Sequence, residues 1–274
     1  MTVCASMLDP VSGEALTVNS GFRLKRFATF LDVINSIPSS SRPLRILDVG
    51  GVEAYWNDKH DLIGRPFEVT LLNTGPVPTS RRDFTSLVGN ACAMPEFSSD
   101  SFDVVHSNSV IEHVGRWSDM MAMANEIRRV ARAYFVQVPY FWFPIEPHCR
   151  VPLIHWLPES VRLRIFMARD CGFYKRSQTV DEAMRTLQDA TLLDKRMFKA
   201  LFPDAERTCE CASGQNVNWK CTQGDQDESP QGQRQTETHC DSDQSHRLKY
   251  LEHNSRSRQD HHPHLGSILT DSLY

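Results

Sequence analysis

The sequence predicts an α/β protein built on a doubly wound, mainly parallel β-sheet. Short apolar runs typical of buried parallel strands recur between residues 45 and 140. A stretch with helical periodicity, residues 117–131, separates the last two of them, as in a βαβ unit. The first run, RILDVGG at 45–51, ends in two glycines, which suits a tight turn at the end of a strand.

The remaining elements follow in chain order. Residues 21–37 place their apolar side chains near one helical face, so we expect an amphipathic helix there. Strands are expected at 45–51, 67–73, 86–91, 102–109 and 133–140, and helices at 117–131, 160–171 and 181–200. Ligands of such sheets bind beyond the carboxyl ends of the strands, so functional residues are expected there.

Length and composition agree with one globular core. The chain has 274 residues, a formal net charge of −4, 23% charged residues and 40% hydrophobic residues. No apolar run approaches the roughly 20 residues that a membrane span needs, and the first 20 residues lack the regions of a signal peptide. We therefore expect a cytoplasmic protein with no membrane span. The near-neutral charge argues against binding of bulk nucleic acid.

The chain divides into two parts of different composition. We expect a folded domain over residues 1–207 and a polar, unfolded tail over 208–274. The tail holds 6 Lys and Arg against 10 Asp and Glu, so it carries the whole net charge. Its Cys209-x-Cys211, Cys221 and His239-Cys240 could be interpreted as zinc ligands. Their spacing is irregular, however, and we expect no metal site in this chain.

Residues 140–158 form a segment that is too rich in proline for a helix or an interior strand. YFWFPIEPHCRVPLIHWLP contains five aromatic residues and four prolines. Two compatible interpretations remain open: a loop that packs down over the core, and an apolar wall that faces a substrate.

Three segments in order resemble one family. ILDVGG at 46–51, residues 89–114 and YFVQVPYFWFPIEPH at 134–148 are similar to motifs of the class I S-adenosylmethionine-dependent methyltransferases, and most similar to their type 11 group. The resemblance covers roughly residues 20–207. It implies a Rossmann-like fold, an enzyme and S-adenosyl-L-methionine as cofactor. The acceptor is not specified, and we expect a small molecule rather than a nucleic acid.

The resemblance implies a set of cofactor-binding residues at the strand ends. In the family, the first-strand acid and the glycine loop hold the amino-acid part of the methyl donor, and later strand ends hold the ribose, the adenine and the methionine portion. The matching residues here are Asp48, Gly50 and Gly51 for the first part, Asn73 for the ribose, Asn90 and Ala91 for the adenine, and Ser107 and Asn108 for the methionine portion.

Two departures from the family pattern favour a second function. Val52 and Ala54 stand where the family's loop has further glycines, and Asn73 stands where it has a ribose-binding carboxylate. The sequence after about Glu206 is polar, whereas the last antiparallel strands of the family are apolar. We therefore expect a truncated or altered end of the sheet. The alternative to an active enzyme is therefore a methyltransferase-like binding or scaffold protein that does not catalyse.

Candidate catalytic residues lie in the proline-rich loop. Glu146 and His148 are the best candidates for a general base, because flanking prolines hold them rigidly and a carboxylate can orient a nearby imidazole. Glu112 and His113 match the Glu-His pair that often follows the fourth strand in the family; for His113 a structural cap and a functional role are both open. His106, within a strand, is expected to be a packed histidine.

Overall fold

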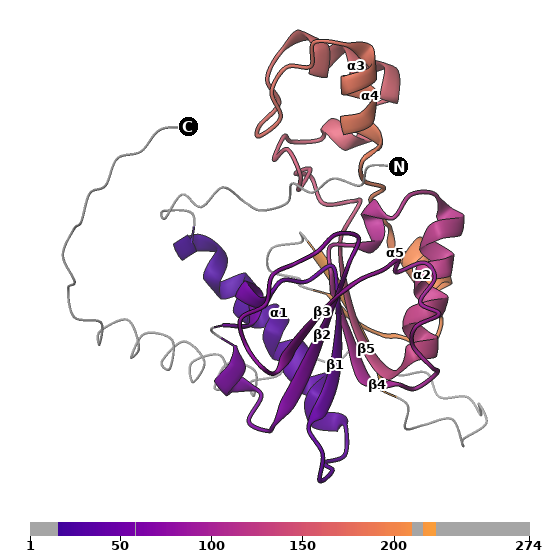
Figure 1. The fold of residues 1–274 in the computed structure, drawn as a ribbon. Coiled ribbons are helices and arrows are strands. Elements are labelled where there is room, and N and C mark those ends of the chain that lie inside the picture. Colours follow the sequence, from indigo (N-terminus) through magenta and orange to yellow (C-terminus); the bar gives the residue numbers. More distant parts are fainter. Residues whose placement is uncertain (1–15, 58, 210–215, 223–274) are drawn as a thin grey trace, which may run out of the picture. The chain divides into compact units, whose positions relative to one another are not determined.

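The computed structural model describes residues 16–57, 59–209 and 216–222. Its central element is a seven-stranded sheet with the order β3-β2-β1-β4-β5-β7-β6 (Figure 1). The strands are β1 (Leu44–Val49), β2 (Phe67–Asn73), β3 (Phe84–Val88), β4 (Phe102–Asn108), β5 (Ala131–Pro139), β6 (Glu206–Cys209) and β7 (Asn216–Thr222). The helices are α1 (Leu16–Ser36), α2 (Trp117–Val130), α3 (Glu159–Ala168), α4 (Val180–Gln188) and α5 (Lys195–Leu201).

The first five strands are parallel, and the order of the sheet reverses between β1 and β4. From β1 the chain moves outward through β2 to β3 and then returns to β4 on the other side of β1. Such a switch point opens a crevice beyond the carboxyl ends of the strands. The predicted α/β, doubly wound, mainly parallel fold is thus confirmed.

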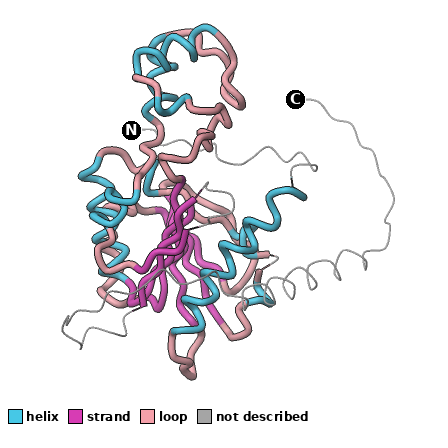
Figure 2. Tube along the Cα trace, turned by 180° about the vertical axis from the view of Figure 1, so that it is seen from behind, coloured by secondary structure: helices cyan, strands magenta, loops and turns pink. Residues whose placement is uncertain are grey.

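Helices cover both faces of the sheet (Figures 1 and 2). On one face the C-terminal part of α1 places Phe30 with its ring centroid 4.9 Å from that of His106 in β4 and 5.7 Å from that of Phe135 in β5. On the other face α2 and α5 pack against the sheet. The buried side chains of α2 recur at three- and four-residue spacing, which is one helical face: Met120, Met123, Ala124, Ile127 and Val130.

The contact pattern divides the chain into two units. One comprises residues 1–11 with 29–229, and the other comprises residues 12–28 with 230–274. The sheet and the helices α2 to α5 lie in the first unit. Within the residues that the structure describes, no helix is both long and apolar enough to cross a membrane.

Residues 140–188 form a small lobe with its own apolar core. The lobe consists of the proline-rich segment, the short 3-10 helix η4 (Ile154–Trp156), α3 and α4. Its buried side chains form a cluster separate from the core beside the sheet: Cys149, Ile154, Phe166, Cys171, Ala183 and Leu187. Capping supports α4, because Thr179 Oγ1 accepts a hydrogen bond from Glu182 N and Gln178 N donates to Glu182 Oε2.

The helix expected over residues 181–200 is in fact two helices. α4 ends at Gln188, and α5 begins at Lys195 after Asp194, whose side chain accepts hydrogen bonds from Arg196 N and Met197 N, both at 2.8 Å. Between the helices, Thr191 N donates to the Glu112 carbonyl and Phe141 N donates to the Leu193 carbonyl. Helical periodicity continues through this segment, but these tertiary hydrogen bonds and the Asp194 cap break the helix.

The expectation of a truncated sheet is wrong. β7 pairs antiparallel with β5 over seven residue pairs, from Ala133↔Thr222 to Pro139↔Asn216, and β6 pairs antiparallel with β7. The boundary predicted at residue 207 therefore falls inside β6. Main-chain pairing of β7 with β5, and of β6 with β7, forms these strands even though their sequence lacks a strong apolar pattern. Residues 210–215 and 223–274 of the predicted tail lie outside the described residues.

Candidate functional site

The predicted cofactor-binding residues lie along the carboxyl edge of the parallel strands. Gly50 and Gly51 follow β1, Asn73 ends β2, and Ser107 and Asn108 end β4. Two hydrogen bonds join the first of these segments: Gly50 N donates to the Leu72 carbonyl at 2.8 Å, and Asn73 Nδ2 donates to the Gly51 carbonyl at 2.9 Å. The Asn73 side chain therefore supports the glycine turn directly, a role that its position in the sequence did not reveal.

The turn after β1 requires its two glycines. Gly50 has a φ of +74°, and a Cβ there would lie 2.5 Å from Val110 Cγ2. A Cβ on Gly51 would lie 1.7 Å from Asp48 Oδ2. The backbone of this turn is therefore fixed by the strand beneath it and bare of side chains where a ligand would approach.

Asp48 lies beneath the glycine turn and is only 1% exposed. Its Oδ2 accepts a hydrogen bond from Trp56 Nε1 at 2.8 Å, and its Oδ1 lies 2.8 Å from His106 Nδ1. The His106 ring in turn stacks on Phe135, with 5.7 Å between ring centroids. Asp48 thus shapes the turn from inside the fold, and His106 is the packed histidine that the sequence predicted.

Asn90 and Ala91 follow β3, at the same edge. Asn90 is exposed, and its Oδ1 accepts a hydrogen bond from Cys92 N at 2.9 Å. That bond closes a local turn, so the oxygen that was expected to receive the adenine amine already has a partner. Ala91 packs against the core beside the sheet.

The end of β4 presents polar atoms that the described part of the chain leaves without hydrogen-bond partners. Ser107 Oγ and Asn108 Oδ1 are both buried in this state. The chain then turns at Ser109, whose φ is +57° and whose N donates to the Gln137 carbonyl at 2.9 Å. Buried polar atoms without partners are rare in native proteins and are commonly explained by a ligand or a water molecule.

Glu112 follows in the short 3-10 helix η3 (Ile111–His113) and is 1% exposed. Neither of its carboxylate oxygens has a hydrogen-bond partner among the described residues. Burial raises the pKa of this carboxyl group, and the nearby His113, His148 and Ser109 hydroxyl offset the rise only in part.

His113 is oriented by the segment between α4 and α5. Its Nδ1 donates to the Asp189 carbonyl at 3.0 Å and lies 3.5 Å from Asp189 Oδ2. Burial lowers the pKa of His113, but the hydrogen bond to Asp189 and the negative charge of Glu112 outweigh it, so the pKa is raised overall. Its Nε2 is buried and has no partner among the described residues.

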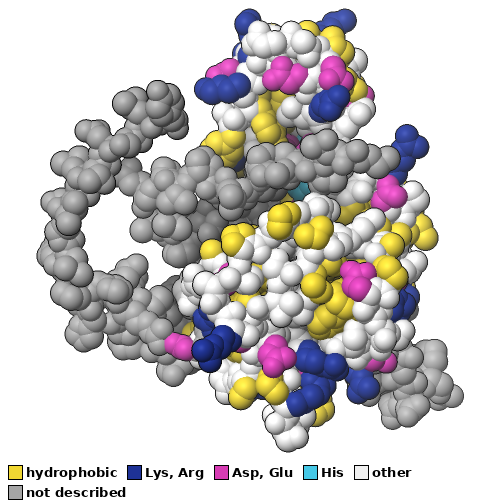
Figure 3. Space-filling view, in the orientation of Figure 1, with side chains coloured by type: hydrophobic (Ala, Val, Ile, Leu, Met, Phe, Trp, Pro, Cys, Tyr) yellow, Lys and Arg dark blue, Asp and Glu magenta, His cyan; other side chains and the backbone are white. Residues whose placement is uncertain are grey.

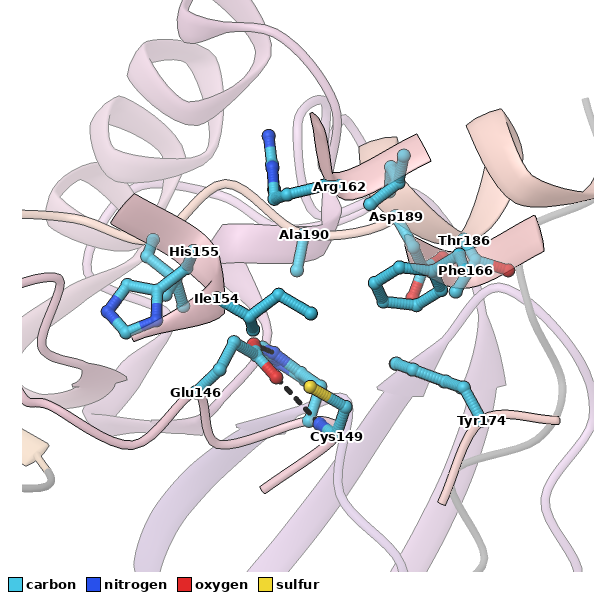
Figure 4. A pocket seen from close by; sticks show the side chains of 13 residues that line it. Glu146, Cys149, Ile154, His155, Arg162, Phe166, Tyr174, Thr186, Asp189 and Ala190 are labelled. Atoms are coloured by element: carbon cyan, nitrogen blue, oxygen red, sulfur yellow. Dashed lines mark hydrogen bonds and ion pairs between the residues drawn. The ribbon is translucent and has the colours of Figure 1, made fainter. Parts of the chain in front are cut away.

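Glu146 and His148 form the pair that the sequence predicted. His148 Nδ1 lies 2.7 Å from Glu146 Oε1, and Cys149 N donates to Glu146 Oε2 at 2.6 Å (Figure 4). Burial raises the pKa of Glu146, but the hydrogen bonds from His148 and Cys149 outweigh it and lower the pKa overall. Glu146 therefore stays a carboxylate, holds the proton of His148 at Nδ1, and leaves Nε2 as an acceptor.

Cys149 itself is not a candidate nucleophile. It is fully buried, and burial together with the carboxylate of Glu146 raises the pKa of its thiol to about 12. The thiolate needed for nucleophilic attack is therefore absent at neutral pH.

A cavity of about 50 Å³ lies inside the lobe, beside Glu146 and His148 (Figure 4). Side chains from α3, α4 and the proline-rich segment line it, among them Ile154, Arg162 and Phe166. The volume suits a few water molecules rather than an acceptor substrate. The packed interior of the lobe agrees with the first interpretation of residues 140–158, a loop that covers a core.

Three of these side chains meet in one cluster. The rings of His113 and His148 lie edge to face with 5.0 Å between centroids, and one donor atom from each of Glu112, His113 and His148 lies within 4.8 Å of the others. The sequence signalled the two parts separately, as Glu-His after β4 and Glu-Pro-His after β5. Their approach depends on the break before α5, which the sequence did not predict.

The comparison with protein families matches the middle of the chain. Residues 70–134 match a family model described as a methyltransferase domain. The matched segment begins in β2 and ends in β5, so it contains Asn73, Asn90, Ser107, Asn108 and Glu112. No curated protein matches the sequence.

Several solved structures show similarity at low sequence identity. The citrinin polyketide synthase CMeT domain has a TM-score of 0.46 and 14% identity, with 73% of this chain and 52% of that chain covered. A SAM-dependent methyltransferase of Methanosarcina mazei has a TM-score of 0.43 and 11% identity, with 69% of this chain and 97% of that chain covered. Phosphoethanolamine N-methyltransferase 2 of Haemonchus contortus, in complex with S-adenosyl-L-methionine, has a TM-score of 0.43 and 12% identity, with 72% of this chain and 52% of that chain covered. The chain thus spans about half the length of the first and third of these.

The match over residues 70–134 agrees with the resemblance of the sequence motifs to the class I S-adenosylmethionine-dependent methyltransferases. The antiparallel pair β6 and β7 completes the sheet in the way that the resemblance implies.

Proposed function

We propose that this protein transfers the methyl group of S-adenosyl-L-methionine to a small-molecule acceptor. The observation that carries the proposal is the coincidence of the family match over residues 70–134 with unpartnered polar atoms at the carboxyl edge of the same segment. The cytoplasmic location expected from the sequence is part of this proposal.

The residues at this edge fit the methyl donor. Gly50 and Gly51 form a turn without side chains, held from below by Asp48 and from the side by Asn73. Ser107 Oγ and Asn108 Oδ1 are buried and have no hydrogen-bond partner among the described residues, and a polar amino-acid group would provide one. When bound, the donor supplies a methyl group that is already activated on a sulfonium sulfur. The chain's own task is then to align the acceptor and to exclude water.

The Glu146–His148 pair is proposed to act on the acceptor. Glu146 fixes the tautomer of His148 through the 2.7 Å contact at Nδ1. Nε2 is then free to interact with an acceptor oxygen or nitrogen as it loses its proton. Methyl transfer to a carbon or sulfur atom needs less help of this kind, so the pair favours an oxygen or nitrogen acceptor.

The surface of the lobe supports a small acceptor with an apolar portion. Trp142 is 57% exposed and lies with its ring centroid 6.0 Å from that of Trp156, itself 40% exposed. Exposed indole rings suit an apolar or planar group. On the face shown in Figure 3, Lys and Arg side chains of the described residues are interspersed with Asp and Glu. That face offers no continuous basic surface of the kind that binds bulk nucleic acid.

The alternative predicted from the sequence is a methyltransferase-like protein that binds without catalysing. One observation favours it: Asp48 is 1% exposed and its two oxygens contact Trp56 and His106, so the carboxylate is engaged inside the fold. The two functions share donor binding and differ in turnover.

Isothermal titration of the full chain with S-adenosyl-L-methionine tests donor binding. N108A is expected to raise the Kd by roughly tenfold, the loss of one good hydrogen bond. N35A, which changes an exposed Asn in the last turn of α1, is the matched control and should leave the Kd unchanged. Absence of binding by well-folded protein would refute the proposal.

Turnover then separates the two functions. If donor binding holds, a screen of small alcohols, phenols and amines for methylated product should identify an acceptor, and E146Q and H148N should each lower kcat. Equal turnover in both variants and the parent protein would remove the Glu146–His148 assignment. Donor binding without product from any acceptor would favour the non-catalytic alternative.

A further inference from the structure

We infer that Glu112, His113 and His148 bind one divalent transition-metal ion. These residues come from η3 and from the loop after β5, and their candidate donor atoms lie within 4.8 Å of one another. No metal site was expected from the sequence, in which the Glu-His and Glu-Pro-His pairs stand 34 positions apart, from Glu112 to Glu146. Only the fold brings the two histidines together.

The environment of Glu112 calls for a cation. The side chain is 1% exposed, and neither carboxylate oxygen has a hydrogen-bond partner among the described residues. A buried carboxylate in this state is strongly unfavourable, and proteins compensate it with paired charges or metal ions. The side chains nearest to it in the cluster are imidazoles, which as neutral ligands would share a cation with it.

Both histidines are already oriented as metal ligands usually are. His113 Nδ1 donates to the Asp189 carbonyl at 3.0 Å, and His148 Nδ1 donates to Glu146 at 2.7 Å. A metal-bound histidine typically gives its other ring N–H to a carbonyl or carboxylate, which fixes the tautomer and the ring orientation. Here that pattern occurs twice, and it leaves Nε2 of each ring for coordination. Nε2 of His113 is buried without a partner among the described residues.

The donor set selects the class of metal. Two imidazole nitrogens and one carboxylate oxygen suit Zn²⁺, Fe²⁺, Mn²⁺ or Co²⁺, whereas Ca²⁺ and Mg²⁺ prefer oxygen ligands alone. Three protein ligands leave coordination positions open, as in catalytic rather than structural sites. Metal–ligand bonds of about 2.1 Å place ligand atoms roughly 3 to 3.5 Å apart, so binding would draw the three side chains together.

The site would define how His148 acts on the acceptor. An acceptor oxygen in an open coordination position would be polarised by the metal and would release its proton to solvent water more easily, so His148 would serve as a ligand rather than as a free base. This consequence rests on the proposed function. Metal binding itself does not, because it is measured without donor or acceptor.

The test uses the full chain with three of its tail histidines replaced, H261A, H262A and H264A, because the closely spaced histidines of HHPH at 261–264 would compete for the metal. After dialysis against a chelator, Co²⁺ is titrated and followed by visible absorption, and Zn²⁺ is titrated by calorimetry. We expect one equivalent of metal and a spectrum without the intense ultraviolet band of thiolate ligation. E112Q and H148N should weaken binding by roughly 100-fold, and E146Q by roughly tenfold through the orientation of His148.

H155N is the matched control, because His155 is also buried in the lobe but bonds to the Phe141 carbonyl through Nε2 and lies outside the cluster. It should keep one equivalent of metal. Thermal unfolding gives a second readout: Co²⁺ should raise the Tm of the parent and of H155N and leave that of E112Q unchanged. Absence of binding, or equal binding by folded E112Q and parent, would overturn the inference. Calorimetry with S-adenosyl-L-methionine on the chelated protein tests the proposed function separately.

Discussion

Asp48 and Glu112 are two carboxylates at the same edge of the sheet, and the structure treats them in opposite ways. Each is 1% exposed. Asp48 has a partner for each oxygen, Trp56 and His106, whereas Glu112 has a hydrogen bond to neither oxygen within the described residues. Burial alone therefore does not distinguish a structural carboxylate from a functional one. The state of its hydrogen bonds does.

The largest change in the free energy of unfolding is expected from removing the Asp48 carboxylate, which bonds to Trp56 and His106. D48A removes the acceptor of two buried donors, Trp56 Nε1 and His106 Nδ1, and should destabilise the fold by about 3–5 kcal/mol in urea unfolding at pH 7. D48N keeps an acceptor for Trp56 and should lose less. A loss below about 1 kcal/mol for D48A would show that the Asp48 network is not structural.

Substitution of Glu112 should change the free energy of unfolding in the opposite direction to substitution of Asp48. In the presence of a chelator, E112Q replaces a buried carboxyl group by a neutral amide and should stabilise the protein, by at most about 1–3 kcal/mol because the raised pKa of Glu112 already limits the cost of its charged form. Urea unfolding of the variant and the parent side by side measures the difference. Clear destabilisation by E112Q would mean that Glu112 has stabilising partners, and the contrast with Asp48 would fail.

A third carboxylate, Asp103 at the opposite end of β4, has hydrogen-bond partners like Asp48, and its contribution to stability should depend on pH. Burial raises its pKa, but hydrogen bonds from Arg42 at 2.6 Å and from Arg45 N at 2.8 Å outweigh it, so the pKa is lowered overall. A lowered pKa stabilises the fold above the unfolded value of about 3.9, and this contribution is lost as the pH falls through the folded pKa.

D103N should therefore cost about 1–2 kcal/mol at pH 7, a value reduced because Arg42 is nearly half exposed. The difference from the parent should shrink as the pH falls below about 3.9 and disappear below the lowered folded pKa of Asp103. Urea unfolding at pH 7 and along an acid series measures it. A difference that persists in acid would show that the effect comes from packing rather than from the charge of Asp103.

The smallest effect belongs to an exposed carboxylate. Asp181 Oδ2 lies 2.9 Å from Arg185 Nε one helical turn along α4, and both side chains are about three quarters exposed. D181N should change the free energy of unfolding by less than about 0.5 kcal/mol, and the change should shrink further in high salt. A larger change would mean that partner geometry matters more than burial across this series.

The sequence pattern predicted the parallel strands of the sheet but not the antiparallel strands β6 and β7 that complete it. The apolar runs around Ile46, Val69, Val104 and Val136 are long enough to identify buried strands without tertiary information. The sequences of β6 and β7 contain no apolar run of this kind. β7 forms by pairing with the edge of β5, and β6 forms by pairing with β7. Pattern alone therefore predicts strands that bury both faces better than strands added at the edge.

The candidate site was predicted in pieces for a similar reason. Glu146 and His148 are two residues apart, so their contact follows from the sequence and is confirmed by the 2.7 Å distance. His113 reaches Asp189 across 76 residues, and no periodicity predicts that contact. Asn90 illustrates the converse, because a residue in the expected place has its side-chain oxygen bonded within its own turn.

The segment between α4 and α5 joins the lobe to the sheet through the main chain. Thr191 N to the Glu112 carbonyl, Phe141 N to the Leu193 carbonyl and His113 to the Asp189 carbonyl are all bonds to backbone atoms. Backbone contacts survive most side-chain substitutions. The exterior of the lobe can therefore change without displacing the histidines. Under the proposed function, the surface that admits the acceptor and the residues that act on it could then vary separately.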